Sequence, residues 1–424
     1  MSDIKKVCII KGKRIPFMRS STSYLGLTLR ELIKPAMDSL ISELNLEGKE
    51  LGEVAMGAVN KHAYDFALAR EIVMDSKLSP NTPATDLQKA CGTSLETIVM
   101  LGNKIALGQI DSAIAGGVDT NSDVPIEFKK KFSDRLLKLA AARSMGEKLK
   151  ALSGFSPKEL MPKLPAIKEG RTGLSMGESC EEMAKSWNIS REAQDQLAFE
   201  SQAKAAKAYS EGWYDDLVVE FQGKVKDGIL RETKLEKLAS LKPAFDKTSG
   251  KGTLTAANST ALTDGASCVF LCSEEYAKDN NLEVMAYLTY AQSAAVNYVG
   301  DEGLLMAPAY AVPKLLKQAG LTLQDFDFYE IHEAFAAQVL CTLEAWKSEE
   351  FCKEKLGLEQ ALGEIDFKKL NVKGGSLALG HPFAATGARI VTGLAKLLNE
   401  KGSGKGLISI CTAGGMGVTA IIER

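Results

Sequence analysis

The sequence predicts an α/β fold made of two similar halves, with a segment of different composition inserted between them. Short apolar runs typical of β-strands alternate with segments of helical periodicity. The same order of features, namely a reactive residue, a buried helix, a strand and a Gly-Gly pair, occurs around Cys91 and again around His381. Between these regions, Ile126–Pro243 departs from the composition of the rest. These observations indicate an internal duplication interrupted by an insertion.

The first half opens with a strand and then alternates between helices and strands. Val7–Ile10 is a short apolar run, and Thr28–Leu44 carries apolar residues at helical spacing. The next predicted elements are a strand at Glu53–Val59, a helix at Phe66–Met74, a helix at Leu95–Leu107, and a strand at Ser112–Ala115 that runs into a turn at Gly116-Gly117. The helix after Cys91 is apolar on most sides, so it is expected to be buried.

The second half follows the same plan. The predicted elements are a strand at Phe326–Tyr329, a helix through Ala336–Leu340, a helix from about Ala384, and a strand at Gly406–Cys411 that runs into a turn at Gly414-Gly415. Open α/β sheets bind ligands in the crevice outside the ends of their strands. A duplicated α/β unit would therefore place the Cys91 and His381 loops on opposite sides of one crevice.

The inserted segment begins with a strongly basic stretch. From Ile126 to Pro165 there are ten basic and four acidic residues, a surplus of six, with leucine, methionine and phenylalanine interleaved. Such an amphipathic segment suits an anionic ligand, a membrane surface or a protein partner, while a merely solvated helical face is the alternative. Ser190–Gly212 starts with an N-cap and acidic early residues, which predicts a further helix.

The predicted domain boundaries follow from this organisation. Residues 1–125 together with 244–278 form the first half, residues 126–243 form the inserted loop domain, and residues 279–424 form the second half.

Composition limits the classes of function. The chain has 424 residues, 45% of them apolar and 25% charged, which is typical of a soluble enzyme with two or three domains. A net charge of −2 gives no reason to expect nucleic acid as a partner. The eight cysteines form no CxxC pair, so we expect no bound metal and a reducing bacterial cytoplasm. No secretory leader and no run of about 18 apolar residues is present.

Two residues at predicted loop-to-helix corners are candidates for a nucleophile and its base. His381 lies between Gly380 and Pro382, which holds it in a tight turn, although a core histidine that caps a loop is the alternative. Cys91 lies where a helix begins, and both a helix N-terminus and a nearby imidazole favour the thiolate. We therefore expect a Cys91 pKa below its usual value of about 8.5. The alternative for Cys91 is a small buried apolar residue.

Two further residues complete the set. His332 lies at a strand-to-helix corner, where a structural histidine bonded to Glu330 or Glu333 is the alternative. Cys411 ends the last predicted strand, so its thiol and the N–H groups that follow it should face the same crevice. Two cysteines and two histidines at comparable corners of an α/β fold are difficult to attribute to packing alone.

Four sequence blocks give the chain a resemblance to the thiolases, the acyl-CoA C-acyltransferases. They are Cys-Gly-Thr-Ser at Cys91, His-Glu-Ala-Phe at His332, Gly-His-Pro at His381 and Cys-x-Ala-Gly-Gly-Met-Gly at Cys411. The resemblance spans Ile4 to Arg424. Many thiolases have asparagine where His332 stands. The His-Glu-Ala-Phe block, together with 172–178 and 255–265, is similar to the thiolase (β) subunits of fatty-acid β-oxidation complexes.

The resemblance implies a layered αβαβα thiolase fold and a ping-pong cleavage of 3-ketoacyl-CoA by CoA. Cys91 would be the nucleophile and His381 its base, while Cys411 would exchange the α-proton, a task for a thiol with a pKa near neutrality. His332 and His381 would hydrogen-bond the thioester oxygen, His332 through a water. The backbone N–H groups of Cys91 and Ala413 would form a second oxyanion hole, provided that the φ of Ala413 is negative.

The resemblance also implies contacts with the substrate. Met176 and Phe335 match positions that line the acyl or pantetheine tunnel, although either could be plain core. Thr260 stands where a serine often contacts pantetheine, and Asn258 is expected to bind CoA as well. CoA is a substrate, so no cofactor is expected. The inserted domain would cover CoA, and its basic stretch would meet the CoA phosphates, a membrane or the α subunit of an oxidation complex.

Other functions remain open from sequence alone. The alternatives are a biosynthetic acetoacetyl-CoA thiolase, a non-catalytic acyl-CoA or lipid carrier, and a cysteine hydrolase. The resemblance further implies a homodimer or a tetramer.

Overall fold

The computed structural model describes residues 4–163 and 168–424 of the chain. The first half contains β1 (Val7–Arg14), β2 (Met18–Arg19), α1 (Leu29–Glu43), β3 (Glu53–Met56), η1 (Ala63–Asp65), α2 (Leu68–Asp75), β4 (Ala84–Asp86), η2 (Ala90–Gly92), α3 (Thr93–Ala106), β5 (Ser112–Asp119), β8 (Thr263–Ser273) and α9 (Glu274–Asp279). The second half contains β9 (Ala286–Ala295), α10 (Ala307–Ala319), β10 (Phe328–Ile331), α11 (Ala336–Lys347), α12 (Glu349–Glu354), η4 (Phe367–Lys369), α13 (Ser376–Leu379), η5 (Phe383–Ala385), α14 (Thr386–Lys401), β11 (Lys405–Thr412) and β12 (Met416–Glu423).

The predicted duplication is visible in the sheet. The main strand order is β10-β11-β12-β9-β1-β8-β5-β3-β4. In the first half β1, β8, β5 and β3 are neighbours in that order, and in the second half β9, β12, β11 and β10 repeat it. Each group has two antiparallel pairings followed by one parallel pairing. The halves meet where β1 pairs with β9 over Val7–Ile9.

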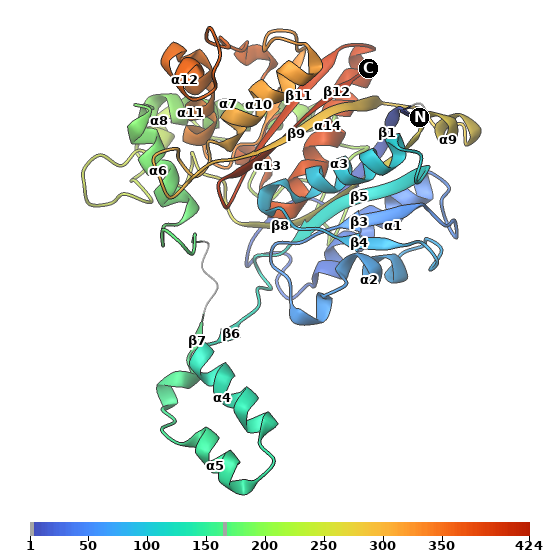
Figure 1. The fold of residues 1–424 in the computed structure, drawn as a ribbon. Helices are drawn as coiled ribbons and strands as arrows, with labels where there is room; N and C mark the ends of the chain where they lie inside the picture. Colours follow the sequence, from blue (N-terminus) through green and yellow to red (C-terminus); the bar gives the residue numbers. More distant parts are fainter. Residues whose placement is uncertain (1–3, 164–167) are drawn as a thin grey trace.

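Five layers result from the way helices cover the two parts of the sheet (Figure 1). Helices α3 and α14 lie between the two parts, and their side chains form one apolar core with strands of both halves. Helices α1 and α2 cover the outer face of the first part, and α10 and α11 cover that of the second. This arrangement confirms the predicted αβαβα fold class. The central pair α3 and α14 is preceded by the Cys91 and His381 loops.

The inserted segment has two distinct parts. The elements of its first part are β6 (Glu127–Phe128), α4 (Lys130–Ala141), α5 (Met145–Leu152), η3 (Pro157–Leu160) and β7 (Pro162–Lys163), and this part projects from the body as a helical hairpin (Figure 1). Its second part, with α6 (Met176–Ser186), α7 (Arg191–Ser210) and α8 (Leu235–Ala239), packs on the second half. The last two residues of the basic stretch Ile126–Pro165 lie outside the described residues. None of the described helices is long and apolar enough to cross a membrane.

One local prediction is wrong. Gly116 and Gly117 do not form a turn but belong to β5, which continues to Asp119. Glycine is needed at 117 because the backbone of Ala384, in the turn after His381, lies against it. In the second half Gly414 and Gly415 do form the predicted turn, with φ angles of 77° and 68°.

Candidate active site

Cys91 lies in a strained turn just before a central helix. It is the middle residue of the 3₁₀ turn η2, and α3 begins two residues later. The preceding residue, Ala90, has a φ of 45°, which non-glycine residues adopt rarely and at a cost in backbone energy. The turn packs against η5, which follows His381, and against β11, which contains Cys411. Cys91 as a whole residue is half-buried.

His381 is held from both its backbone and its ring. Its N–H donates to Thr263 Oγ1 at 2.8 Å, and its Nδ1 lies 2.6 Å from Thr386 Oγ1 at the start of α14. The turn after it is fixed because Ala384 N–H donates to Asp119 at 2.7 Å. The predicted tight turn is therefore built from β5, β8 and α14 together.

His332 is anchored by a serine rather than by a glutamate. Its N–H donates to the carbonyl of Ser409 at 2.9 Å, and its Nδ1 lies 2.8 Å from Ser376 Oγ. Glu333 instead accepts from Ser201, Asn371 and the backbone of Leu377. The alternative of a structural histidine bonded to Glu330 or Glu333 therefore does not describe this ring.

The structure brings three of the predicted residues together. The two imidazole centroids are 4.1 Å apart, and one nitrogen of each ring lies within 4.8 Å of the other and of the Cys91 sulfur. Both Nδ1 atoms are engaged, whereas both Nε2 atoms are buried and without a partner among the described residues. A thiol and two imidazoles could hold a soft divalent metal, but they equally suit a nucleophile, a base and a hydrogen-bond donor.

The expected low pKa of Cys91 is wrong. Burial raises the pKa of Cys91 to about 12, although the Ala413 N–H donates to the thiol and opposes the shift. Burial, reinforced by the Arg389 charge, lowers the pKa of His381 to about 3 and that of His332 well below its usual value. Neither imidazole is then a cation that could stabilise a thiolate. The resting pair is a neutral thiol beside a neutral base.

Cys411 lies at the end of β11, next to the same site. It is buried with 1% exposure, and burial together with a charge on Cys91 raises its pKa well above the usual value, which contradicts the expected pKa near neutrality. Ala413, two residues on, does not adopt a positive φ, unlike Gly414 and Gly415. The condition on Ala413 is therefore met, and its N–H points at the Cys91 thiol.

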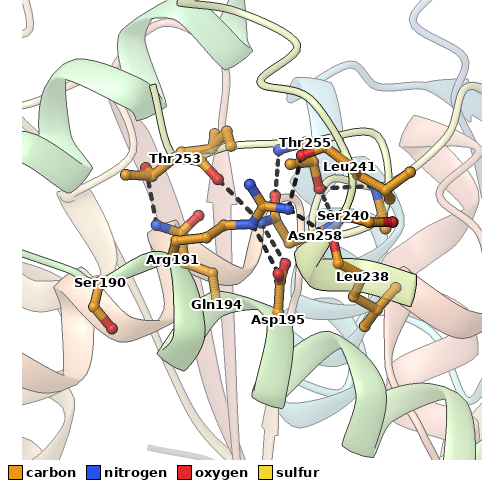
Figure 2. A network of polar contacts seen from close by, with 12 residues as sticks. Ser190, Arg191, Gln194, Asp195, Leu238, Ser240, Leu241, Thr253, Thr255 and Asn258 are labelled. Carbon is orange, nitrogen blue, oxygen red and sulfur yellow. Dashed lines mark hydrogen bonds and ion pairs between the residues drawn. The ribbon is translucent and has the colours of Figure 1, made fainter. Parts of the chain in front are cut away.

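Asn258 does not fit its predicted contact with CoA. It is fully buried, its Oδ1 accepts from Thr255 N–H at 2.7 Å, and its Nδ2 donates to Asp195 at 3.0 Å and to the Thr253 carbonyl at 3.3 Å. Figure 2 shows this network, in which Asp195 also accepts a hydrogen bond from Arg191 Nε. Asn258 thus fixes the loop before β8 on helix α7, and its side chain has no room for a ligand.

Thr260 lines a cleft whose wall is connected to both histidines. The cleft has a volume of about 500 Å³, and its lining includes Arg19, Arg231, Phe245 and Leu262 as well as Thr260. Thr260 Oγ1 donates to the carbonyl of Ser376, whose hydroxyl contacts His332, and Leu262 pairs with the backbone of His381. Two lining residues therefore lie next to His381 and next to Ser376, the serine that contacts His332.

Met176 and Phe335 belong to one apolar cluster with Cys411. Phe335 is 8% exposed and packs edge-on against Phe245 with ring centroids 5.9 Å apart. Met176, the first residue of α6, is partly buried in the same cluster. The apolar cluster around Cys411 thus extends through Phe245 to the lining of the cleft.

Several residues that support the site are not predicted from the sequence. Ser376, Thr386 and Arg389 lie on either side of His381 in the chain and contact one another or the two histidine rings. Asp119, beyond the predicted strand Ser112–Ala115, accepts hydrogen bonds from the backbone N–H groups of residues 59, 60 and 384. Glu169 accepts from Gly414 N–H at 2.7 Å, which joins the inserted segment to the Ala413 turn. Only long-range pairing, invisible in one sequence, gives these residues their roles.

Comparison with known proteins gives a consistent result. Residues 7–275 match the thiolase N-terminal domain, and residues 282–424 match the thiolase C-terminal domain. A 3-ketoacyl-CoA thiolase of Vibrio cholerae is 42% identical over 99% of this chain and 97% of its own, and one of Shewanella putrefaciens is 41% identical over the same shares.

Solved structures agree with these relatives. An acetyl-CoA acetyltransferase of Bacillus anthracis has a TM-score of 0.81 at 28% identity, covering 100% of both chains. A human mitochondrial 3-ketoacyl-CoA thiolase in complex with CoA has a TM-score of 0.81 at 26% identity, covering 99% of this chain and 98% of its own. With the family matched over both halves, and with its reactive residues assembled at the ends of the duplicated strands, this chain belongs to the thiolase family of acyltransferases.

Proposed function

We propose that this protein is a 3-ketoacyl-CoA thiolase of fatty-acid β-oxidation. It would use CoA to cleave a 3-ketoacyl-CoA into acetyl-CoA and an acyl-CoA shortened by two carbons. The observation that carries the proposal is the meeting of the Cys91 sulfur with one nitrogen each of His332 and His381, next to Cys411. The 42% identical relative supports the choice of substrate class.

In the first half-reaction Cys91 attacks the 3-keto carbon as its proton passes to His381. Transfer during the attack fits the resting state, because the thiol is protonated and the imidazole is neutral. The bond between C2 and C3 then breaks, which leaves the shortened acyl group as a thioester on Cys91 and releases the enolate of acetyl-CoA. The N–H groups of Cys91 and Ala413 would hold the tetrahedral oxyanion, and losing one such donor costs about 10²–10³ in rate.

Cys411 completes the cleavage by protonating C2 of the enolate. A thiol with a raised pKa is a weak acid, so it keeps its proton until a strong base such as the enolate carbon forms beside it. The His332 and His381 Nε2 atoms have no partner among the described residues, so they would be free to hydrogen-bond the enolate oxygen as it develops charge. The proton that His381 took from Cys91 then restores the Cys411 thiol.

In the second half-reaction His381 takes the proton of the CoA thiol. The CoA sulfur attacks the thioester carbon, Cys91 leaves as the thiolate, and His381 returns the proton to it. CoA would lie in the cleft lined by Thr260 and Phe245, with Arg19 and Arg231 near its phosphates. CoA is consumed and regenerated as acyl-CoA, so no further cofactor is required.

Mass spectrometry of the protein mixed with acetoacetyl-CoA or with a 3-ketohexadecanoyl-CoA tests this proposal. We expect an acyl adduct on Cys91 that disappears when CoA is added, and no adduct in Cys91→Ala. A non-catalytic carrier would bind CoA esters without any adduct, and a cysteine hydrolase would release free acid without CoA. A biosynthetic acetoacetyl-CoA thiolase would turn over the short substrate but leave the long one nearly untouched.

The α4–α5 hairpin suggests that the enzyme works at a membrane surface. Its apolar side chains are exposed, for example Leu137 at 69%, Met145 at 69% and Leu149 at 65%. Together with the surplus of six basic charges, this gives an amphipathic surface that extends away from the catalytic body (Figure 1). We propose that the hairpin inserts these side chains at the surface of an anionic bilayer while its lysines contact the headgroups.

Vesicle flotation separates membrane contact from its alternatives. The protein should float with vesicles containing phosphatidylglycerol and not with pure phosphatidylcholine, and Leu137→Glu with Leu149→Glu should abolish flotation without loss of thiolase activity. Absence of flotation would contradict the proposal and favour the α subunit of an oxidation complex as the partner of the hairpin. A homodimer or tetramer in the bacterial cytoplasm belongs to the same proposal and is measured by light scattering.

A further inference from the structure

A buried chain of hydrogen bonds connects an arginine to the ring of His332. Arg389, in the first turn of α14, is 8% exposed, and its Nη2 donates to Ser376 Oγ at 2.9 Å. Ser376 is fully buried at the start of α13, and the same Oγ lies 2.8 Å from His332 Nδ1. One serine hydroxyl thus contacts both a permanent cation and an imidazole of the site.

The hydrogens of this chain can be placed by counting donors and acceptors. A guanidinium only donates, so Ser376 Oγ accepts from Arg389. The single hydroxyl hydrogen of Ser376 then needs an acceptor, and among the described residues His332 Nδ1 is the one found within hydrogen-bond distance of Oγ. If Nδ1 carried a hydrogen, the buried hydroxyl hydrogen would have no acceptor, which proteins avoid. The arrangement therefore favours an unprotonated Nδ1.

The charge of Arg389 sets the second condition. Burial, His381 and Arg389 all disfavour a charge on His332 and keep its pKa well below the usual value. A neutral imidazole with an unprotonated Nδ1 carries its hydrogen on Nε2. That Nε2 is buried and has no partner in the described part of the chain, and one nitrogen of the same ring lies within 4.8 Å of the Cys91 sulfur.

We propose that Arg389 and Ser376 are positioning residues that hold neutral His332 as the Nε2–H tautomer, so that His332 presents a fixed hydrogen-bond donor to the reacting oxygen. The inference rests on the proposed thiolase function, because the substrate oxygen would receive this bond.

Nitrogen-15 NMR of histidine-labelled protein measures the tautomer directly. The chain has only three histidines, so His62→Gln and His332→Asn suffice to assign the spectrum. In the unmodified protein at neutral pH, His332 should show a pyridine-type Nδ1 and a pyrrole-type Nε2. Ser376→Ala should mix the two tautomers and lower kcat about 10–100-fold, while the KM for CoA changes little.

Ser409→Ala is the matched control. Ser409 is 1% exposed, its hydroxyl has no partner among the described residues, and its carbonyl holds the His332 backbone, so the variant removes an equally buried hydroxyl that does not touch the ring. Its tautomer signals should stay as in the unmodified protein.

Two results would overturn the inference. One is a pyrrole-type Nδ1 on His332 in the unmodified protein, a measurement that needs no variant to fold. The other is an unchanged His332 spectrum in folded Ser376→Ala. Failure of the thiolase proposal would appear separately, as the absence of an acyl adduct on Cys91.

Discussion

Gly117→Ala tests whether the close approach between β5 and the His381 turn sets the geometry of catalysis. A Cβ at residue 117 would lie 2.5 Å from the carbonyl carbon of Ala384 and closer still to its oxygen, whereas real Cβ contacts essentially never fall below 3.0 Å. The carbonyl oxygen must therefore retreat by roughly 0.9 Å, and overpacking of this kind costs about 1–3 kcal/mol. Asp119 and Ser267 hold the same turn, so strain will reach His381.

The expected result is a lower melting temperature together with slower acylation. A displacement of about 1 Å in a catalytic group can cost about 10²-fold in rate, so we expect acyl-Cys91 to form 10–100 times more slowly in rapid-quench mass spectrometry. Gly393→Ala is the matched control in α14, because its Cβ would lie 3.7 Å from Trp213, an ordinary contact. It should gain up to about 1 kcal/mol of helix stability and keep full activity. Normal acylation and melting in Gly117→Ala would refute the reasoning.

Three further predictions concern buried polar groups. Asp227→Asn should lower the urea midpoint by the equivalent of about 3–5 kcal/mol, because it breaks the bidentate pair with the buried Arg14, and an unchanged midpoint would contradict this. His381→Asn should reduce the loss of unfolding free energy that the protein suffers on acidification. The pKa of His381 is about 3 in the folded protein and about 6.5 in the unfolded chain, so protons bind the unfolded chain preferentially as the pH falls below 6.5. This preference destabilises the unmodified protein by about 2 kcal/mol between pH 7 and pH 5. If the unmodified protein and His381→Asn lost equal unfolding free energy between pH 7 and pH 5, the result would argue against a buried neutral His381 ring. Asn258→Ala should cost about 1–3 kcal/mol by leaving Asp195 and Thr255 partly unpaired, yet leave the tautomer of His332 unchanged by NMR.

The fold was predictable wherever local pattern and tertiary structure agree. Thr28 with Glu31 forms a capping box at the start of α1, and the apolar run of β11 is buried, so both appear near their predicted places. The strand β8 was missed because its Thr263–Ser273 segment mixes small, polar and apolar residues, and only burial on both faces makes it a strand. Gly116-Gly117 was misread because a glycine needed for close approach looks the same in sequence as one needed for a turn.

The candidate site was predictable in its membership but not in its electrostatics. Cys91, His332 and His381 stand in short blocks rich in glycine or proline, and their meeting follows from the duplication. The pKa shifts of the two histidines could not be predicted in this way, because they depend on burial and on the charge of Arg389, a residue of α14. Asn258 was misassigned for the same reason: a polar residue in a family block can serve the scaffold instead of the ligand.

The position of β1 has a consequence for synthesis of the chain. This strand is made first, yet its partners are β8 and β9, which begin 256 and 279 residues later. At roughly 5–20 residues per second, the ribosome needs about 13–51 s to reach β8. During that interval the apolar backbone of β1 has no strand to pair with, so we expect it to depend on chaperones until β8 and β9 have been synthesised.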